Sequence, residues 1–174
     1  MLAEQAHVRP VAVADLDKIA GIFACYVTNS VATFEEVAPS VAHWRRRLDD
    51  LAARPLPFLA AEVGGKVVGY AYASPWRKSP AYRHTVEDTI YLAPEWTGKG
   101  LGRLLLERLL AECARAGVRQ VIAVIADTGE PTSAALHYAC GFVDAGRLRA
   151  VGHKQGRWVD TLLLQRILTT GNHH

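Results

Sequence analysis

A chain of 174 residues is long enough to form one domain whose buried core needs neither disulfides nor metals for stability. Half of its residues are hydrophobic and 21% are charged, a composition that is ordinary for a globular protein and excludes a disordered one. The formal net charge of +3 is too small to indicate nucleic-acid binding and suits an enzyme that holds a small anionic ligand at one place.

The beginning of the chain predicts one strand and two helices. Residues 7–13 are expected to form the strand, and Asp15 to cap a helix whose apolar side chains recur at helical spacing as far as Val27. Ser40 is expected to begin the second helix, which Pro55 ends.

The middle of the chain predicts three strands. Two apolar runs, 58–63 and 66–73, are separated by Gly64-Gly65, and a glycine pair between such runs is typical of a tight hairpin because both residues tolerate a positive φ. Residues 84–92 alternate, with Glu87 on one side of the strand and Asp88 on the other.

The last part predicts a helix over 101–114 ended by Gly117, a buried strand over 118–125, a short helix over 131–140 and a final hairpin. The hairpin strands are expected at 142–151 and 157–164. The element order βααβββαβαββ predicts an α/β fold, a mixed sheet flanked by helices, in a single domain over 1–168 with a tail over 169–174.

Cysteines and the N-terminus indicate a cytoplasmic protein. Cys25, Cys113 and Cys140 are odd in number and widely spaced, which favours free thiols in a reducing compartment. Residues 1–9 lack the apolar segment of a secretory signal, and no apolar stretch approaches the roughly 20 residues of a membrane span. The histidines and cysteines form no metal-binding spacing, so we expect no metal.

The segment 96–103, Trp-Thr-Gly-Lys-Gly-Leu-Gly-Arg, lies between a predicted strand and a predicted helix. Its glycines let backbone N–H groups converge at a helix N-terminus, which forms an anion site. It is neither a P-loop, which needs GxxxxGK(S/T), nor a dinucleotide fingerprint, because Arg103 replaces the third glycine of GxGxxG. A glycine-rich helix entry without a ligand is the alternative.

The same spacing matches the acetyl-CoA loop Gln/Arg-x-x-Gly-x-Gly/Ala of the GNAT N-acetyltransferases, with Thr97 in place of the usual Gln or Arg. Further short matches in the same order make the chain resemble the phosphinothricin N-acetyltransferase group of GNAT enzymes, which includes methionine sulfone and sulfoximine acetyltransferases. These matches are Tyr72–Arg77, Thr85–Glu87, Tyr91–Gly102, His137 ahead of Gly141-Phe142, and Gly152–Asp160.

The resemblance implies acetyl-CoA as co-substrate and assigns two catalytic residues. Glu87 would be the base that deprotonates the acceptor amine; the alternatives are a solvated strand carboxylate, or Asp88 as a weaker rival. His137 would either donate a proton to the leaving thiolate or simply pack. Relatives usually carry an Asn where this chain has Glu130, so Thr132 or Ser133 is expected to replace that contact with the cofactor. The expected cofactor-binding residues are Ile90, Tyr91, Leu92, Thr97, Gly98, Lys99, Gly100, Leu101, Gly102, Arg103, Glu130 and Ser133.

The acceptor side is expected to be basic. Arginines near Glu87 match a carboxylate and a second oxygen-rich group better than lysines do. A solvated basic loop is the alternative for the charged residues, and a place in the core for the aromatic ones. The expected substrate-binding residues are Phe34, Trp76, Arg77, Tyr82, Arg83, Lys154 and Trp158.

The sequence thus predicts N-acetylation of the α-amine of a small amino acid or analogue, by direct attack on acetyl-CoA. Cys113 and Cys140 lie in apolar surroundings that do not activate a thiol, which disfavours an acetyl-enzyme. The rival functions are acetylation of protein N-termini or polyamines by the same fold, and a non-catalytic acetyl-CoA-binding module. The resemblance further implies a homodimer; no nucleic-acid or membrane partner is expected.

Overall fold

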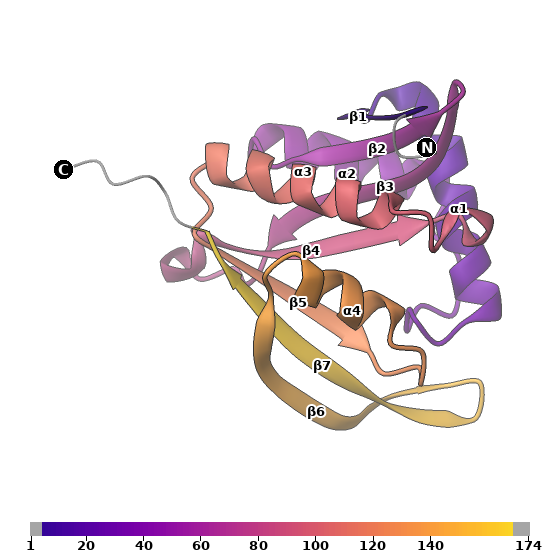
Figure 1. Cartoon of the computed structure of the whole chain (residues 1–174), viewed down its shortest axis with the longest axis vertical. Coiled ribbons are helices and arrows are strands. Elements are labelled where there is room, and N and C mark those ends of the chain that lie inside the picture. The colour runs from indigo at the N-terminus through magenta and orange to yellow at the C-terminus, as the bar shows by residue number, and fades with distance from the viewer. Residues whose placement is uncertain (1–4, 169–174) are drawn as a thin grey trace.

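A seven-stranded mixed sheet runs through the molecule (Figure 1). The computed structural model describes residues 5–168, so the expected tail over 169–174 lies outside the described residues. The strands stand in the order β1-β2-β3-β4-β5-β7-β6, and every neighbouring pair is antiparallel except β4 and β5, which run parallel. They are β1 (Ala6–Pro10), β2 (Phe58–Val63), β3 (Lys66–Pro75), β4 (Thr85–Leu92), β5 (Gln120–Ala126), β6 (Val143–Lys154) and β7 (Arg157–Ile167). The predicted α/β architecture and element order are confirmed.

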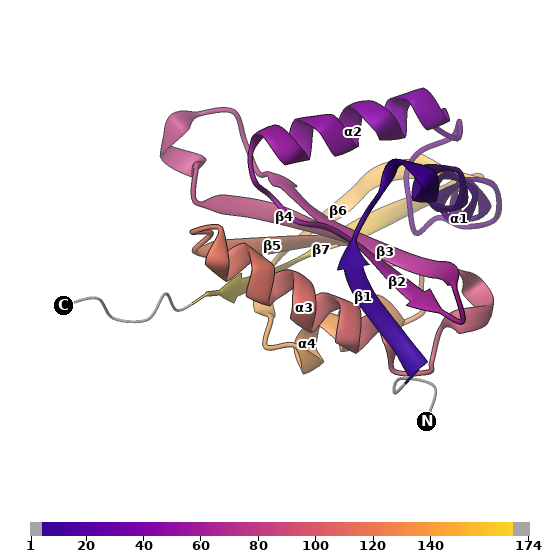
Figure 2. The same ribbon diagram turned by 90° about the horizontal axis from the view of Figure 1, so that it is seen from above.

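Four helices cover the two faces of this sheet. Figure 2 shows α1 (Leu16–Asn29) and α2 (Val41–Ala53) over one face, and α3 (Leu101–Arg115) and α4 (Thr132–Ala139) over the other. Short 3-10 turns connect the larger elements: η2 (Val13–Asp15), η3 (Pro80–Tyr82) and η4 (Pro94–Trp96).

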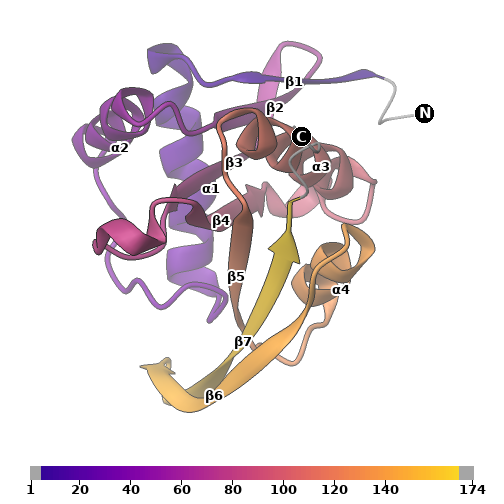
Figure 3. The same cartoon turned by 90° about the vertical axis from the view of Figure 1, so that its left-hand side faces the viewer.

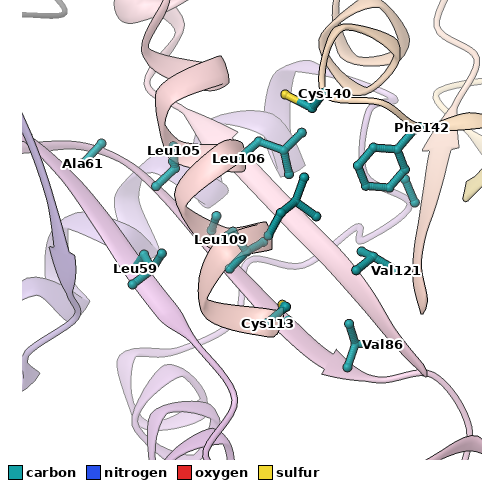
Figure 4. Close-up of a cluster of buried hydrophobic side chains, with 14 of the residues drawn as sticks. Leu59, Ala61, Val86, Leu105, Leu106, Leu109, Cys113, Val121, Cys140 and Phe142 are labelled. Carbon is teal, nitrogen blue, oxygen red and sulfur yellow. The ribbon is translucent and has the colours of Figure 1, made fainter. Parts of the chain in front are cut away.

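The core has one layer on each side of the sheet. Beneath α3, the buried side chains of Leu105, Leu106 and Leu109 pack against strand residues such as Val86 and Val121 (Figure 4). The layer beneath α1 and α2 is rich in aromatic residues: Phe23, Trp44, Phe58, Tyr70 and Tyr72. These two layers fix β3 and β4 from both sides.

The N-terminal segment differs from the prediction. The first strand ends at Pro10 instead of Val13, and the chain turns into η2. Asp15 does not cap α1 with its side chain; its carboxylate accepts hydrogen bonds from both Nη atoms of Arg9 at 2.7 and 2.9 Å, and from the backbone N–H of Ala12 at 2.7 Å. Arg9 on β1 therefore holds the Asp15 carboxylate, which does not cap α1.

Two local predictions are confirmed. Ser40 begins α2, and its Oγ accepts a hydrogen bond from the N–H of His43 at 3.2 Å. Gly64 and Gly65 both adopt a positive φ, 57° and 79°, in the hairpin that joins β2 to β3.

The β6/β7 hairpin reaches away from the main body of the sheet (Figure 3). Its turn contacts the segment that follows α1, because the Lys154 ammonium donates to the carbonyl oxygens of Ser30 at 2.7 Å and Thr33 at 2.9 Å. Next to Lys154, the Gln155 amide donates to the carbonyl oxygen of Thr28 at 3.2 Å. The hairpin turn and the α1–α2 loop are thus fixed together.

Candidate active site

The parallel strands β4 and β5 separate along their length. They pair only where residues 85–87 face 120–122, and beyond Glu87 the register ends. The later parts of the two strands form opposite walls of a cavity of about 490 Å³. Because neither wall pairs with the other there, backbone polar groups are left for a bound molecule.

Many of the sequence-predicted site residues meet in this cavity. These residues come from β4, the turn after η4, the loop before α4 and α4 itself: Glu87, Ile90, Tyr91, Leu92, Thr97, Glu130, Ser133 and His137. Asp88, the weaker rival for the base, also lines it.

Several lining residues were not predicted. They include Tyr26, Ser30 and Ala32 from the end of α1 and the segment after it, Thr89 on β4, and the β5 segment 123–126. By its helical spacing Tyr26 belongs to the apolar side of α1, but its hydroxyl donates to the carbonyl oxygen of Leu92 at 2.5 Å. Thr89 shares the face of Glu87, which is the signal that would have found it.

Glu87 lies at the fork where the two strands part. Its cross-strand partner on β3 is Ser74, and its side chain is half-buried on the face covered by α1 and α2. Burial raises the pKa of the Glu87 carboxyl above its usual value, as does the charge of Asp88, while the charges of Arg77 and Arg47 lower it. The net rise suits a general base that works near neutral pH.

His137 forms a buried pair with Asp88 on the opposite face. Its Nε2 lies 2.7 Å from Oδ2 of Asp88, and its Nδ1 lies 2.7 Å from the carbonyl oxygen of Ser133. Burial works against protonation of the ring, but the hydrogen bond and charge of Asp88 prevail and raise the pKa of His137. The ring therefore holds its proton more strongly than a free imidazole does, and both of its nitrogen atoms already have partners.

The glycine segment forms the expected helix entry at the end of the cavity. Gly98 and Gly100 have φ values of 72° and 84°, which only glycine adopts readily, and Gly100 is the N-cap of α3. Gly102 is small for a different reason: a Cβ there would meet Leu136 of α4 at 3.2 Å. The turn leaves the first N–H groups of α3 available for an anion.

Three side chains around this turn have partners within the protein. The Thr97 hydroxyl donates to the carbonyl oxygen of Pro94 at 2.9 Å and so closes η4. The Lys99 ammonium lies 4.9 Å from the centre of the Trp96 ring, and Arg103 pairs with Glu107 at 2.9 Å on the exposed surface of α3. The segment 98–103 lies beyond the cavity lining, with Thr97 as its link to the cavity.

The predicted substrate residues lie outside the lining of this cavity. Arg77 is exposed and stacks over the Trp76 ring at 4.6 Å, in the turn between β3 and β4. In the same turn Tyr82 is exposed, and Arg83 donates to the carbonyl oxygen of Pro80 at 3.0 Å. Of these residues, Arg77 is the one whose charge acts on Glu87.

The remaining three lie around the β6/β7 hairpin. Phe34 packs directly on Gly152, where a Cβ would come within 2.4 Å of its ring. Lys154 is buried and holds the α1–α2 loop, as described above. Trp158 is 70% exposed and contacts His153, with ring centres 4.7 Å apart.

All three cysteines are free thiols. Burial raises the pKa of Cys113 to about 12 and raises that of Cys140 as well, so neither is an activated nucleophile. Within residues 5–168 no cluster of three or more His, Cys, Asp or Glu side chains is placed to hold a metal ion. In the same part of the chain, no helix has the length and apolar character to cross a membrane.

Comparison with known proteins identifies the family of the chain. The model of the acetyltransferase (GNAT) family matches residues 22–142. A phosphinothricin N-acetyltransferase of Alcaligenes faecalis is 48% identical over 158 residues, which cover 91% of this chain and 80% of that protein. An L-methionine sulfoximine/L-methionine sulfone acetyltransferase of Pseudomonas aeruginosa is 35% identical over 161 residues, covering 92% of this chain and 93% of that one.

A solved structure of a related enzyme is also similar to this chain. The phosphinothricin acetyltransferase of Sinorhizobium meliloti, crystallised in complex with AcCoA, superposes with a TM-score of 0.91 at 45% identity. The match covers 96% of this chain and 90% of that one. The family match and these relatives show that the chain belongs to the acetyltransferase (GNAT) family and is an N-acetyltransferase.

Proposed function

We propose that this enzyme transfers the acetyl group of acetyl-CoA to the α-amine of a small amino-acid analogue of the phosphinothricin or methionine sulfone type. The observation that carries the proposal is the position of Glu87, a carboxylate with a raised pKa at the fork of β4 and β5. The relatives named for these acceptors, and the neighbour that holds AcCoA, support the choice of both substrates.

In this mechanism β4 and the N-terminus of α3 bind acetyl-CoA, and Glu87 deprotonates the acceptor. Unpaired backbone of β4 around Ile90 would hold the pantetheine arm, and the N-terminus of α3 after Gly100 would bind the pyrophosphate. The Glu87 carboxylate accepts a proton from the acceptor ammonium, and the freed nitrogen attacks the thioester carbon. The C–S bond then breaks, the attacking nitrogen loses a second proton as the amide forms, and a proton is taken up by the coenzyme A thiolate that leaves.

His137 has a positioning task in this scheme. Both of its ring nitrogen atoms are engaged, by Asp88 and by the Ser133 carbonyl. Direct proton donation to the thiolate would break one of these bonds. Its hydrogen bond to Asp88 instead fixes α4 against β4 at the edge of the cavity.

A thiol-release assay with a panel of acceptors tests the proposal. Phosphinothricin, methionine sulfone and methionine sulfoximine should each release coenzyme A in a reaction that saturates. Spermidine and a peptide with a free N-terminus represent the rival acceptors and should give little. Release with only these rivals, or acetyl-CoA binding without release from any acceptor, would overturn the proposal.

We also propose a homodimer in the cytoplasm. Support for the dimer comes from exposed apolar side chains on the terminal hairpin, whose strand β6 is an edge of the sheet: Val143, Leu148, Val151, Trp158 and Ile167. The three free cysteines suit a reducing compartment. Light scattering after size-exclusion chromatography should give twice the chain mass, and a monomer would refute the dimer.

A further inference from the structure

A second cavity, of about 330 Å³, lies between α2 and the end of β3. Its lining is basic: Arg46, Arg47, Arg54 and His43 face the single acidic residue Asp50. The strand contributes Ser74, whose cross-strand partner is Glu87. This cavity therefore approaches the proposed base from the side covered by α2. None of the sequence-predicted site residues lines it.

Arg47 is the one arginine of this cavity that is held in place by aromatic rings. Its guanidinium carbon lies 4.6 Å from the centre of the Tyr72 ring and 5.9 Å from that of Trp44. Its Nε is buried without a hydrogen-bond partner among the described residues. It costs free energy to bury part of a guanidinium without a hydrogen-bond acceptor. A bound anion would offset that cost.

The position of Arg47 relates it to the reacting centre. Tyr72, which its guanidinium covers, pairs with Thr89 across β3 and β4, and Ser74 pairs with Glu87 two residues along. Directly opposed residues of an antiparallel pair point to the same face. The positive charge of Arg47 accordingly acts on both Tyr72 and Glu87.

We propose that Arg47 binds the α-carboxylate of the amino-acid acceptor. The proposal rests on the proposed function and names a residue that recognises the substrate. The α-carboxylate is attached to the same carbon as the α-amine, so its partner must lie near Glu87. Because every α-amino acid carries this group, a guanidinium fixed on a helix suits it, and its planar fork matches a carboxylate bidentately. Arg77, in an exposed turn, is better placed for the variable side chain of the acceptor.

Paired acceptors test this assignment. L-methionine sulfone and its primary amide share the α-amine and the side chain, and only the first has a carboxylate. Arg47→Gln should raise the KM for the free acid about tenfold or more while changing the KM for the amide less than about twofold. Arg47→Lys should recover part of the loss, and Arg45→Gln, on the exposed side of the same helix, should leave both constants unchanged.

A purely structural role gives a different result. If Arg47 only supports Tyr72, Arg47→Gln will change the constants for acid and amide in parallel, and that outcome would overturn the assignment, as would no change in either. Calorimetric titration of coenzyme A-saturated protein with the same two compounds gives a readout that needs no turnover. If the wild-type enzyme acetylates neither compound, the proposed function is wrong. Calorimetry with the Arg47→Gln variant still decides whether Arg47 binds the carboxylate.

Discussion

His137 and Asp88 join α4 to β4 at the edge of the active-site cavity. The 2.7 Å hydrogen bond between His137 Nε2 and Asp88 Oδ2 connects α4 to β4, and both side chains are almost completely buried. The other ring nitrogen, Nδ1, faces the carbonyl oxygen of Ser133, which is an obligate acceptor. The ring donates from Nδ1 to this carbonyl, and the Asp88 carboxylate accepts from Nε2 when the ring is protonated. The pair thereby sets the orientation of His137 and favours its protonated form.

Asp88→Asn should destabilise the enzyme in a pH-dependent way. Asp88 raises the pKa of His137, so the stabilisation is fully present below the ordinary histidine pKa of about 6.5 and is lost as the pH rises through the raised value. We expect a loss of about 2 kcal/mol in the free energy of unfolding at about pH 6 and a smaller loss at about pH 9. Urea denaturation at both pH values measures this difference.

The exposed Asp49, which pairs with Arg45 on α2, gives a matched control. Asp49→Asn should cost only a few tenths of a kcal/mol at either pH. An NMR titration should also show a lower pKa for His137 in Asp88→Asn. Equal destabilisation of this variant at both pH values would contradict the charged pair.

Glu87→Gln should reduce kcat by a factor on the order of 10² and leave the affinity for acetyl-CoA unchanged. A base acts in its deprotonated form, so kcat/KM of the wild type should rise with pH through the raised pKa of Glu87. The variant should lack that inflection. Glu112→Gln is the control, because this half-buried carboxylate on α3 pairs with Arg108 and Arg115 and does not line the cavity. A Glu87→Gln enzyme with wild-type turnover and pH profile would remove Glu87 from the mechanism.

The sequence predicted most of the fold because its signals are local. The glycine pair before β3, the Ser40 cap and the apolar period of α3 each depend on neighbours a few residues away, and each was correct. Asp15 was misassigned because Arg9 on β1 captures its carboxylate, together with the Ala12 N–H. A cap and a cross-element ion pair have the same sequence signal, and only the tertiary arrangement decides between them.

The site was predicted less completely, for a related reason. Strand alternation placed Glu87 and Asp88 on opposite faces, which is what the structure shows. The partner of His137 is Asp88, 49 residues earlier, and no local pattern joins the two. Arg47, which we propose as a ligand of the acceptor carboxylate, was not predicted because an arginine in an amphipathic helix resembles a solvated surface residue. Its exposure to the cavity depends on how α2 crosses β3.

Gly100→Glu should abolish coenzyme A binding. With a φ of 84° at this position, any side chain costs about 1–2 kcal/mol of strain, and a carboxylate would also place negative charge at the anion site. Gly100→Gln carries the same strain without the charge, so it should weaken binding much less. Titration calorimetry with coenzyme A, after circular dichroism has shown both variants folded, measures the difference. Wild-type affinity in folded Gly100→Glu would refute the phosphate-binding turn.

Arg77→Ala should raise the KM for acceptors with an oxygen-rich side chain and scarcely change the KM for acetyl-CoA. Arg77 is exposed in the turn before β4, and its charge lowers the pKa of Glu87. Loss of a charge-assisted contact corresponds to about 2–3 kcal/mol in binding terms, and Arg77→Lys should recover part of it because an ammonium lacks the planar fork.

Arg83 provides the comparison within the same turn. Its guanidinium donates to the Pro80 carbonyl, so Arg83→Ala should raise the KM for the acceptor less than Arg77→Ala does, although the sequence alone predicted both arginines as substrate ligands. Steady-state kinetics with phosphinothricin and with methionine, which lacks the side-chain oxygens, separates side-chain recognition from general effects. The Arg77→Ala penalty should be larger for phosphinothricin. Equal penalties for both acceptors, or wild-type constants in both alanine variants, would show that these arginines are surface charges.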